Sequence, residues 1–385
     1  MKKFFTKEVV ASVLFLAVVI FFFVSTTLSN LPFSPKKIET VYTEKLYNKE
    51  FFVEVWSLSR RLSTGNKATI IEDAEYGNII RDTHGKLHFP AAHLDISYET
   101  GQVLEFSAFL NERDIPFVYI QAPNKKLEGY TVFPDGGENY ANEDCDKLLE
   151  ILKENNINTL DLRRSIIEDN LDRDSLFYNT DHHWTTKTAF WAYGEVTDYL
   201  NRIFGLDIDP DGFYRDLENY KVTSYPESYL GSLGRRVGSA IAGYDDYDFI
   251  SPDFETDYTV YDGIVSLDNP MRQGDFREAI VKQSILDSTD KSANKHASYF
   301  EYDYGNLIIK NNKVNNGIKI LLIKDSFSLP FAAFLSTCVS EIHMIDLRDS
   351  ASPAPTEYAE KFDFDCVMVM YNPEVFDTVL FDFMK

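Results

Sequence analysis

Short apolar runs of strand length alternate with helix-like stretches over most of the chain. The apolar runs that we predict as strands stand at residues 117–120, 159–162, 318–323, 342–347 and 366–371. Helices are predicted at residues 98–111, 143–155 and 189–200. Strands that alternate with helices are typical of an α/β layered domain built on a mostly parallel sheet, so the sequence predicts a domain of this class.

The pattern changes between residues 205 and 300, where glycine, aspartate and tyrosine are frequent and regular periodicity is lost. We interpret this stretch as an insertion of loops and short strands. The predicted organisation is therefore a membrane anchor over residues 1–30, a juxtamembrane linker and lead-in over 31–80, and a main domain over 81–385 that contains the insertion.

The anchor is predicted from the segment between Val9 and Leu28, which carries no charged residue and follows several lysines. About 20 apolar residues are enough to cross a bilayer as a helix, and flanking lysines hold that end in the cytoplasm. A cleaved signal peptide is the alternative, with Ser25–Thr27 as the only region that resembles a cleavage site. We expect an uncleaved, single-pass helix in the cell membrane, with the rest of the chain extracytoplasmic.

The charge balance narrows the choice of partners. The chain has 38 basic and 61 acidic residues, which gives a formal net charge of −23. Nucleic acid is therefore excluded as an expected partner, because phosphate binding needs a basic surface.

Cysteine is rare and its count is odd. Cys145, Cys338 and Cys366 have no metal-site spacing, so we predict buried free thiols. A bridge between Cys338 and Cys366 is the alternative that the sequence leaves open.

Two stretches carry candidate chemistry. Asp181, His182 and His183 stand side by side in a chain with only seven histidines, and Thr185 and Thr186 follow as helix N-cap candidates. Residues two apart on an extended turn point to the same side, so we expect Asp181 to orient His183 while His182 points away.

The second stretch places Ser326 between a predicted strand and the following helix. A serine hydroxyl becomes a nucleophile when a histidine takes its proton and a carboxylate fixes that histidine. We therefore predict a catalytic set of Ser326, His183 and Asp181. The structural alternative is that Asp181 and Ser326 only cap helices and His183 packs under Trp184.

Several polar residues follow predicted strands, at the sheet edge where α/β proteins carry their chemistry. They are Asn124, Asp181, Ser326, Arg348 and Asn372.

The group Asp181-His182-His183-Trp184 resembles the signature of the DHHW protein family, which is similar to the SGNH-hydrolase-like O-acetyltransferases of alginate acetylation. Lys324-Asp325-Ser326-Phe327 resembles the Gly-Asp-Ser-[Phe/Tyr] nucleophile block of that family. Two further stretches, Tyr229–Gly234 and Pro123–Lys125, also resemble family blocks. The resemblance extends from about residue 80 to the end of the chain.

This resemblance implies a flavodoxin-like SGNH fold that is circularly permuted, because Asp181 and His183 precede Ser326 in the chain. It implies that Arg348 and Asn372 occupy the second and third oxyanion-hole positions and that Asn124 contributes to oxyanion or substrate binding. The sequence departs from the family pattern at Lys324, where glycine is usual. The Gly-x-Asn spacing of ordinary members is also absent at Asn372.

The implied function is acetyl transfer to hydroxyls of a cell-surface polysaccharide, with a membrane-bound O-acyltransferase as the acyl-donor partner and with no cofactor and no metal. The alternatives are a carbohydrate esterase and a non-catalytic glycan-binding or assembly component, for which the tyrosine-rich insertion offers stacking surfaces. A metal-dependent phosphoesterase is the last alternative, because Asp-His-His also names such a family. That chemistry needs further ligands around two metals. The remaining histidines are scattered and we expect no ligand role for them: His84, His88, His93, His296 and His343.

Overall fold

The computed structural model describes residues 17, 20–28, 49–65, 67–73, 75–374, 376 and 378–384. The chain divides into two compact units, Met1–Gly65 and Asn66–Lys385. In the first unit, residues 20–28 are helical and helix α3 spans Lys49–Thr64. Among the described residues, no helix is long and apolar enough to cross a membrane. About half of the predicted span Val9–Leu28 lies outside the described residues.

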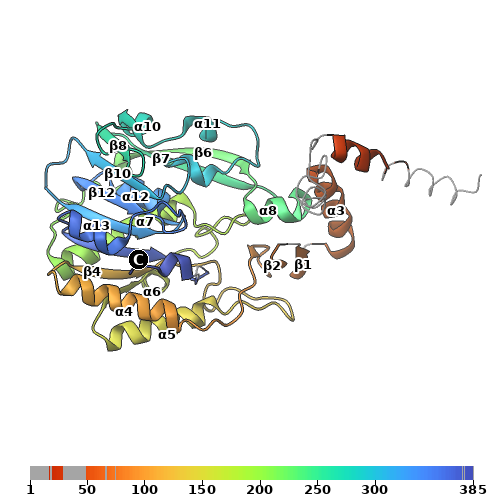
Figure 1. Ribbon diagram of the computed structural model, residues 1–385. Helices are drawn as coiled ribbons and strands as arrows, with labels where there is room; N and C mark the ends of the chain where they lie inside the picture. The colour runs from red at the N-terminus through yellow and green to blue at the C-terminus, as the bar shows by residue number, and fades with distance from the viewer. Residues whose placement is uncertain are drawn as a thin grey trace, which may run out of the picture. The chain divides into compact units, whose positions relative to one another are not determined.

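An eight-stranded sheet forms the centre of the second unit, in the order β5-β4-β13-β11-β12-β10-β8-β9 (Figure 1). The strands from β5 to β12 in this order are parallel, and β10, β8 and β9 continue the sheet antiparallel. Their bounds are β4 Phe117–Gln121, β5 Asn158–Asp161, β8 Tyr258–Asp262, β9 Arg272–Gly274, β10 Asn306–Asn311, β11 Lys319–Lys324, β12 Glu341–Ile345 and β13 Cys366–Tyr371. The prediction of a mostly parallel sheet is confirmed.

The strand order also identifies the permutation. If the count starts at β11, which precedes Ser326, the parallel strands follow as β11, β12, β13, β4 and β5. Their order in space is then 2-1-3-4-5, which is the flavodoxin-like order of doubly wound sheets. The chain therefore opens this topology between the third and fourth strands, as a circular permutation requires.

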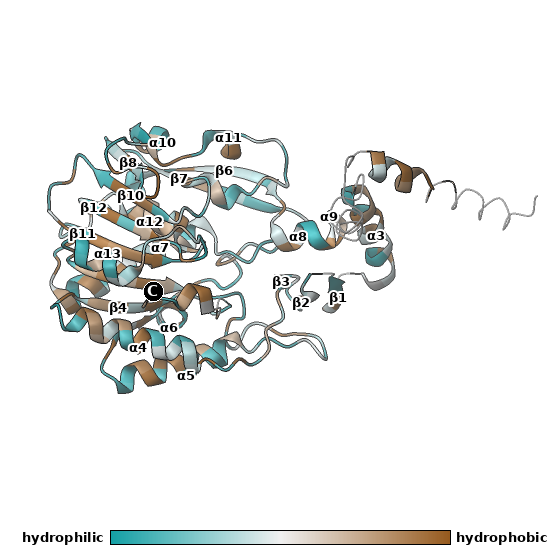
Figure 2. Cartoon of the chain, in the orientation of Figure 1, coloured by the Kyte–Doolittle hydropathy of each residue, from teal (hydrophilic) through white to brown (hydrophobic). Residues whose placement is uncertain are grey.

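Side chains of the parallel strands alternate between two hydrophobic clusters, one on each face of the sheet. On β11, Ile320 and Leu322 belong to one cluster, and Leu321 and Ile323 belong to the other. Figure 2 shows the apolar residues concentrated in these central strands. The first face is covered by α6 (Leu162–Glu168), α7 (Thr186–Phe204) and α12 (Ser328–Leu335). The second face is covered by α4 (Ser97–Asn111), α5 (Ala141–Glu154) and α13 (Pro355–Lys361).

Helix α7 begins and ends where its sequence indicates. The Thr185 hydroxyl accepts a hydrogen bond from Thr188 N, so the predicted N-cap is confirmed. Gly205 closes the helix with φ of 67°, a left-handed conformation that glycine adopts without steric cost. Phe190 of α7 packs edge-on against Phe334 of α12, with 5.1 Å between ring centroids. This contact joins the helix that follows the histidine pair to the helix that follows Ser326.

The insertion contains longer strands than predicted, and part of it joins the main sheet. Strands β6 (Tyr220–Tyr229) and β7 (Asp245–Pro252) pair antiparallel by themselves, whereas β8 and β9 extend the central sheet. The short helices are η2 Leu217–Asn219, α8 Ser232–Val237, α9 Ser239–Ala242, α10 Phe276–Ala279, α11 Gln283–Leu286 and η3 Lys295–Ser298. Several tyrosines of this region are fully buried, so they form core rather than stacking surfaces: Tyr229, Tyr247, Tyr258 and Tyr299.

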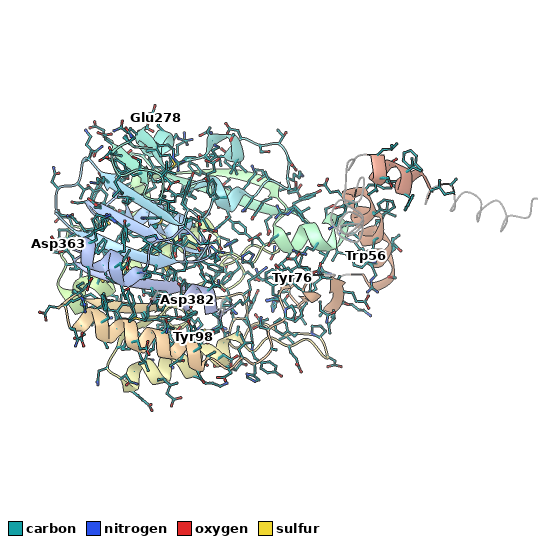
Figure 3. All side chains as sticks on the ribbon, viewed as in Figure 1. Trp56, Tyr76, Tyr98, Glu278, Asp363 and Asp382 are labelled. Carbon is teal, nitrogen blue, oxygen red and sulfur yellow. The ribbon has the colours of Figure 1, made fainter. Side chains whose placement is uncertain are left out.

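A small antiparallel sheet begins the second unit, with β1 at Thr69–Asp73, β2 at Gly77–Arg81 and β3 at Leu87–His88. The C-terminal segment, with η4 at Thr378–Phe381, returns to α4, where the Tyr98 hydroxyl donates to the Asp382 carboxylate (Figure 3).

The three cysteines are buried and free, so the prediction of free thiols is confirmed and the Cys338–Cys366 bridge is absent.

Candidate active site

Asp181, His183 and Ser326 form one chain of hydrogen bonds. His183 Nδ1–H donates to Asp181 Oδ1 at 2.5 Å, and the Ser326 hydroxyl donates to His183 Nε2 at 2.8 Å. This tautomer is assigned from the partners, because an ionised carboxylate only accepts hydrogen bonds. Asp181 and His183 are buried, whereas Ser326 is partly exposed. The structure thus brings together the three residues that the sequence analysis singled out.

The surroundings set the protonation states of the pair. Burial alone would raise the pKa of Asp181, but the imidazoles of His183 and His182 and the Ser232 N–H hold this pKa well below its usual value. Burial, reinforced by the imidazoles of His182 and His296, holds the pKa of His183 well below its usual value although Asp181 acts in the opposite direction. At neutral pH the site therefore holds a carboxylate and a neutral imidazole, which is the state that a general base needs.

Buried charges on both sides fix the loop that carries the aspartate. Asp245, at the start of β7, accepts hydrogen bonds from Asn179 N at 2.7 Å, Thr180 N at 2.8 Å and Thr180 Oγ1 at 2.6 Å. Lys125 Nζ donates to Tyr178 O at 2.9 Å and to Asn179 O at 3.1 Å. Burial lowers the pKa of Lys125 to about 8. Because both groups are buried, these hydrogen bonds are little weakened by water and hold the loop in one conformation.

The backbone around Gly231 packs directly against Asp181. Ser232 N donates to Asp181 Oδ2 at 2.7 Å, and Gly231 N donates to Thr180 Oγ1 at 2.7 Å. A Cβ on Gly231 would lie 2.2 Å from Asp181 Cβ, which is far inside van der Waals contact. Gly234 is also closely packed, because a Cβ there would lie 2.8 Å from Thr180 Cβ. Glycine at these two positions lets the backbone approach the loop closely enough to bind it.

The turn that carries Ser326 is also tied down. The Asp325 carboxylate accepts hydrogen bonds from Phe327 N at 2.9 Å, Asn372 N at 2.7 Å and Asn372 Nδ2 at 2.8 Å. Burial raises the pKa of Asp325 to about 6, although these hydrogen bonds act in the opposite direction. Trp184 Nε1 donates to Phe327 O at 3.0 Å. The serine turn is therefore bound both to the end of β13 and to the histidine loop.

Three further candidate residues lie after strands of the parallel sheet, as predicted. Asn124 follows β4 and donates from Nδ2 to Glu374 Oε1 at 3.4 Å. Arg348 follows β12 and donates from Nε to Asp346 Oδ1 at 2.9 Å. Asn372 follows β13 and donates to the carboxylate next to the serine. Within the described residues, the hydrogen bonds that these three side chains donate go to carboxylates, and their role in oxyanion or substrate binding stays a prediction.

Lys324, which stands where the family has glycine, is fully buried beside the serine turn. Its Nζ donates to Asp346 Oδ2 at 2.9 Å and to the Asp303 carboxylate. Arg348 binds the same two carboxylates, at 2.5 Å to Asp346 Oδ2 and 2.9 Å to Asp303 Oδ2. Two cations thus balance two carboxylates, and loss of one partner would leave an uncompensated buried charge.

Two details of the predicted geometry are wrong. Asp181 does not directly follow a strand, because β5 ends at Asp161 and α6 lies between them. His182 does not point away from the site, since its ring centroid lies 3.8 Å from that of His183. The reason is that residues 179–183 form successive bends rather than an extended turn, so the neighbouring side chains of His182 and His183 do not point to opposite sides.

His296, which the sequence analysis set aside, lies at the site. Its ring stacks on His183 with 3.7 Å between centroids and 13° between planes. Its Nε2–H donates to the backbone carbonyl of Ser326 at 2.8 Å. No local motif marks this residue, because it reaches the site only through the packing of the insertion.

Asp181, His182 and His183 each offer a metal-ligand atom, and these atoms lie within 4.8 Å of one another. Both ring nitrogens of His183 and both carboxylate oxygens of Asp181 are already engaged in hydrogen bonds. A metal ion would have to displace these partners. The expectation that the protein needs no metal stays a prediction.

Comparison with known proteins identifies the fold. Residues 90–230 match the family model of the SGNH hydrolase-like domain of the acetyltransferase AlgX. A structure of Bacillus cereus PatB1 with a sulfonyl adduct is 19% identical, with a TM-score of 0.66 over 83% of this chain and 100% of that chain. The fold is SGNH-like. A DHHW family protein from Eubacterium siraeum is 15% identical, with a TM-score of 0.56 over 81% of this chain and 95% of that chain. No curated protein matches the sequence.

The family match covers only part of the SGNH-like site. Residues 90–230 include Asp181 and His183 but not Ser326. The family match therefore spans the Asp-His-His-Trp group, whereas Ser326 lies outside it and is placed beside His183 by the geometry.

We predict that Gly231→Ala disrupts the site through its clash with Asp181. The φ of Gly231 is −69°, which alanine adopts freely, so the effect is steric and isolates the close packing. Overpacking of this kind destabilises by about 1–3 kcal/mol or more, and urea unfolding should detect it. Gly101→Ala in α4 is the matched control, because a Cβ there meets nothing within 4 Å and should leave stability equal or higher. Equal stability of both variants would contradict the packing account.

Proposed function

We propose that this protein is an extracytoplasmic SGNH-like O-acetyltransferase that transfers acetyl groups to hydroxyls of a cell-surface polysaccharide. The observation that carries the proposal is the hydrogen-bond chain from Asp181 through His183 to Ser326. The match of residues 90–230 to the domain of an acetyltransferase supports the reaction type. The sulfonyl adduct in the structure of PatB1 is consistent with a reactive nucleophile on this fold.

In the first half-reaction, Ser326 Oγ attacks the carbonyl carbon of the acyl donor while His183 Nε2 takes the hydroxyl proton. Collapse of the tetrahedral intermediate breaks the bond to the leaving group, which receives the proton from His183. The products are an acetyl-serine and the protonated leaving group. Asp181 stabilises the imidazolium that forms between the two proton transfers.

In the second half-reaction, a sugar hydroxyl attacks the acetyl-serine and His183 takes its proton. The acetyl group passes to the sugar oxygen, and the proton returns to Ser326 Oγ. A water molecule in place of the sugar would give a carbohydrate esterase, which is therefore the closest alternative function. Exclusion of water from the acceptor site decides between the two outcomes.

The oxyanion of each tetrahedral intermediate needs donors next to the nucleophile. The backbone N–H of Ser326 makes no hydrogen bond to the residues that the structure describes, which makes it available as one donor. Asn372 is the candidate for a second donor, although its Nδ2 now donates to Asp325. Arg348 and Asn124 stay candidates for contacts to the substrate.

The acyl group has to reach an extracytoplasmic serine from the cell interior. We propose a membrane-bound O-acyltransferase as the partner that delivers it, with the charge-free segment Val9–Leu28 holding this protein in the same membrane. The two remaining alternatives make different predictions. A non-catalytic glycan-binding component would have no serine-dependent activity, and a metal-dependent phosphoesterase would lose activity on chelation.

The first prediction of this proposal concerns the three residues as a unit. The purified chain should hydrolyse 4-nitrophenyl acetate, and Ser326→Ala and His183→Ala should each lower kcat/KM by about 10⁴-fold. The double variant should be little worse than either single variant, because the residues act in the same step. Asp181→Asn should be severe as well, since the amide stabilises the wrong imidazole tautomer.

Ser328→Ala is the matched control, because this buried serine lies two residues from Ser326 and its hydroxyl has no hydrogen-bond partner among the described residues. It should retain wild-type activity, and chelator should leave the wild type unchanged. Wild-type activity in all the triad variants would sink the catalytic proposal in favour of the glycan-binding component. Loss on chelation, with recovery on addition of manganese or zinc, would favour the phosphoesterase.

A separate prediction concerns the membrane. Full-length protein should sediment with membranes and resist carbonate extraction, because a helix across the bilayer does not depend on charge. The domain C-terminal to the anchor should be digested by external protease. Recovery of a soluble form that begins near residue 28 would instead identify the segment as a cleaved signal peptide.

A further inference from the structure

Three imidazoles lie in contact at the site, with the His182 ring tilted by 37° to His183 and the His296 ring stacked on His183 at 13°. The ring centroids lie 3.8 Å apart in the first pair and 3.7 Å apart in the second. His183 thus contacts two other imidazoles, while Asp181 and Ser326 bind its two ring nitrogens. These contacts restrict rotation of the imidazole that moves the proton.

His296 contacts both members of the reacting pair. Besides its stack on His183, its Nε2–H donates to the Ser326 carbonyl at 2.8 Å and so fixes the peptide group that follows the serine. The side chain of His296 is buried, with 3% of the residue exposed. The mechanism above uses neither of these contacts.

The insertion holds His296 rigidly in place. Lys295 is buried, and its Nζ donates to Leu286 O at 2.9 Å and to Ser288 O at 3.2 Å. The Tyr229 hydroxyl donates to Asn294 Oδ1 at 3.1 Å, directly before η3. These bonds anchor the two residues that precede the histidine, so η3 is a fixed support rather than a loop free to adapt.

Burial favours a neutral imidazole at this position, whereas the neighbouring charges act in both directions. Asp181 and Asp303 raise the pKa of His296, and Lys324 lowers it. Burial is the largest influence on the pKa of His296 and lowers it. A neutral imidazole can stack on His183 without repelling the cation that forms there during proton transfer.

We propose that His296 is a positioning residue of the acyl-transfer reaction, which holds the His183 ring by stacking and the Ser326 turn by a hydrogen bond. This inference rests on the proposed function, because it assigns to one residue the alignment that the Ser326–His183 step requires. Misplacement of reacting groups by about 1 Å can lower a rate by about 100-fold. His296 therefore contributes to kcat, and substrate binding is independent of it.

The experiment compares three variants of the full chain with 4-nitrophenyl acetate as substrate. His296→Ala should lower kcat by about 100-fold at unchanged KM. His296→Gln keeps an N–H donor for the Ser326 carbonyl, and His296→Phe keeps the stacked ring, so each should recover part of the loss. This partial rescue by two chemically different residues separates positioning from a general loss of structure.

His343→Gln is the matched control for replacing a buried histidine. His343 lies on β12, with Nδ1 2.7 Å from the Tyr358 hydroxyl and with no contact to Ser326 or His183 among the described residues. Its variant should lose thermal stability but keep kcat. Thermal unfolding of every variant is measured in parallel. If His296→Ala does not fold, the kcat values of His296→Gln and His296→Phe test the inference instead.

Two outcomes would overturn the inference. A kcat within twofold of wild type in the folded His296 variants would mean that the stack is only structural, and a raised KM at unchanged kcat would make His296 a substrate contact. Both leave the proposed function intact, provided that Ser326→Ala still abolishes hydrolysis. Hydrolysis that survives Ser326→Ala, or is absent from the wild type, would overturn the proposed function together with the inference.

Discussion

The hydrogen bond from Ser326 Oγ to His183 Nε2 joins two loops that are 143 residues apart in the sequence. It can form only if the strand before the serine and the helix after the histidine are placed to within a fraction of an ångström. The parallel sheet supplies this placement, because β11 ends at the edge where its helix α12 packs against α7. A second bond of the same span, from Trp184 Nε1 to the Phe327 carbonyl, keeps the loops together without using either reacting group.

The insertion is the other constraint on the site. Asp245 holds the aspartate loop from one side, Ser232 binds the aspartate itself, and His296 reaches the serine turn. All of these residues lie between β5 and β11, which are the last and first strands of the unpermuted order. The insertion therefore supplies residues that line the site, and its buried tyrosines form the core against which these residues are held in place.

Most of the fold follows from local pattern, because apolar runs of strand length between amphipathic helices leave few other architectures. The three residues of the hydrogen-bond chain are also predictable, because Asp181 and His183 stand together in a short motif and Ser326 follows a predicted strand in a segment that resembles a known nucleophile block. The orientation of His182 is not, because it depends on backbone bends that the residue types do not encode. The environment of Lys324 is equally unpredictable, because its buried charge depends on ion pairs with Asp303 and Asp346, which belong to other segments of the chain. His296 belongs to this second class, as its position is determined by tertiary packing alone.

The central claim is that Ser326 is a nucleophile activated by His183, and covalent labelling tests it without any assumption about the natural substrate. The full-length protein is treated with an aryl sulfonyl fluoride, and the modified residue is located by peptide mass spectrometry. The account predicts a single adduct on Ser326 that forms slowly in His183→Ala and not at all in Ser326→Ala. Labelling of another residue, or labelling of Ser326 at an unchanged rate without His183, would contradict it.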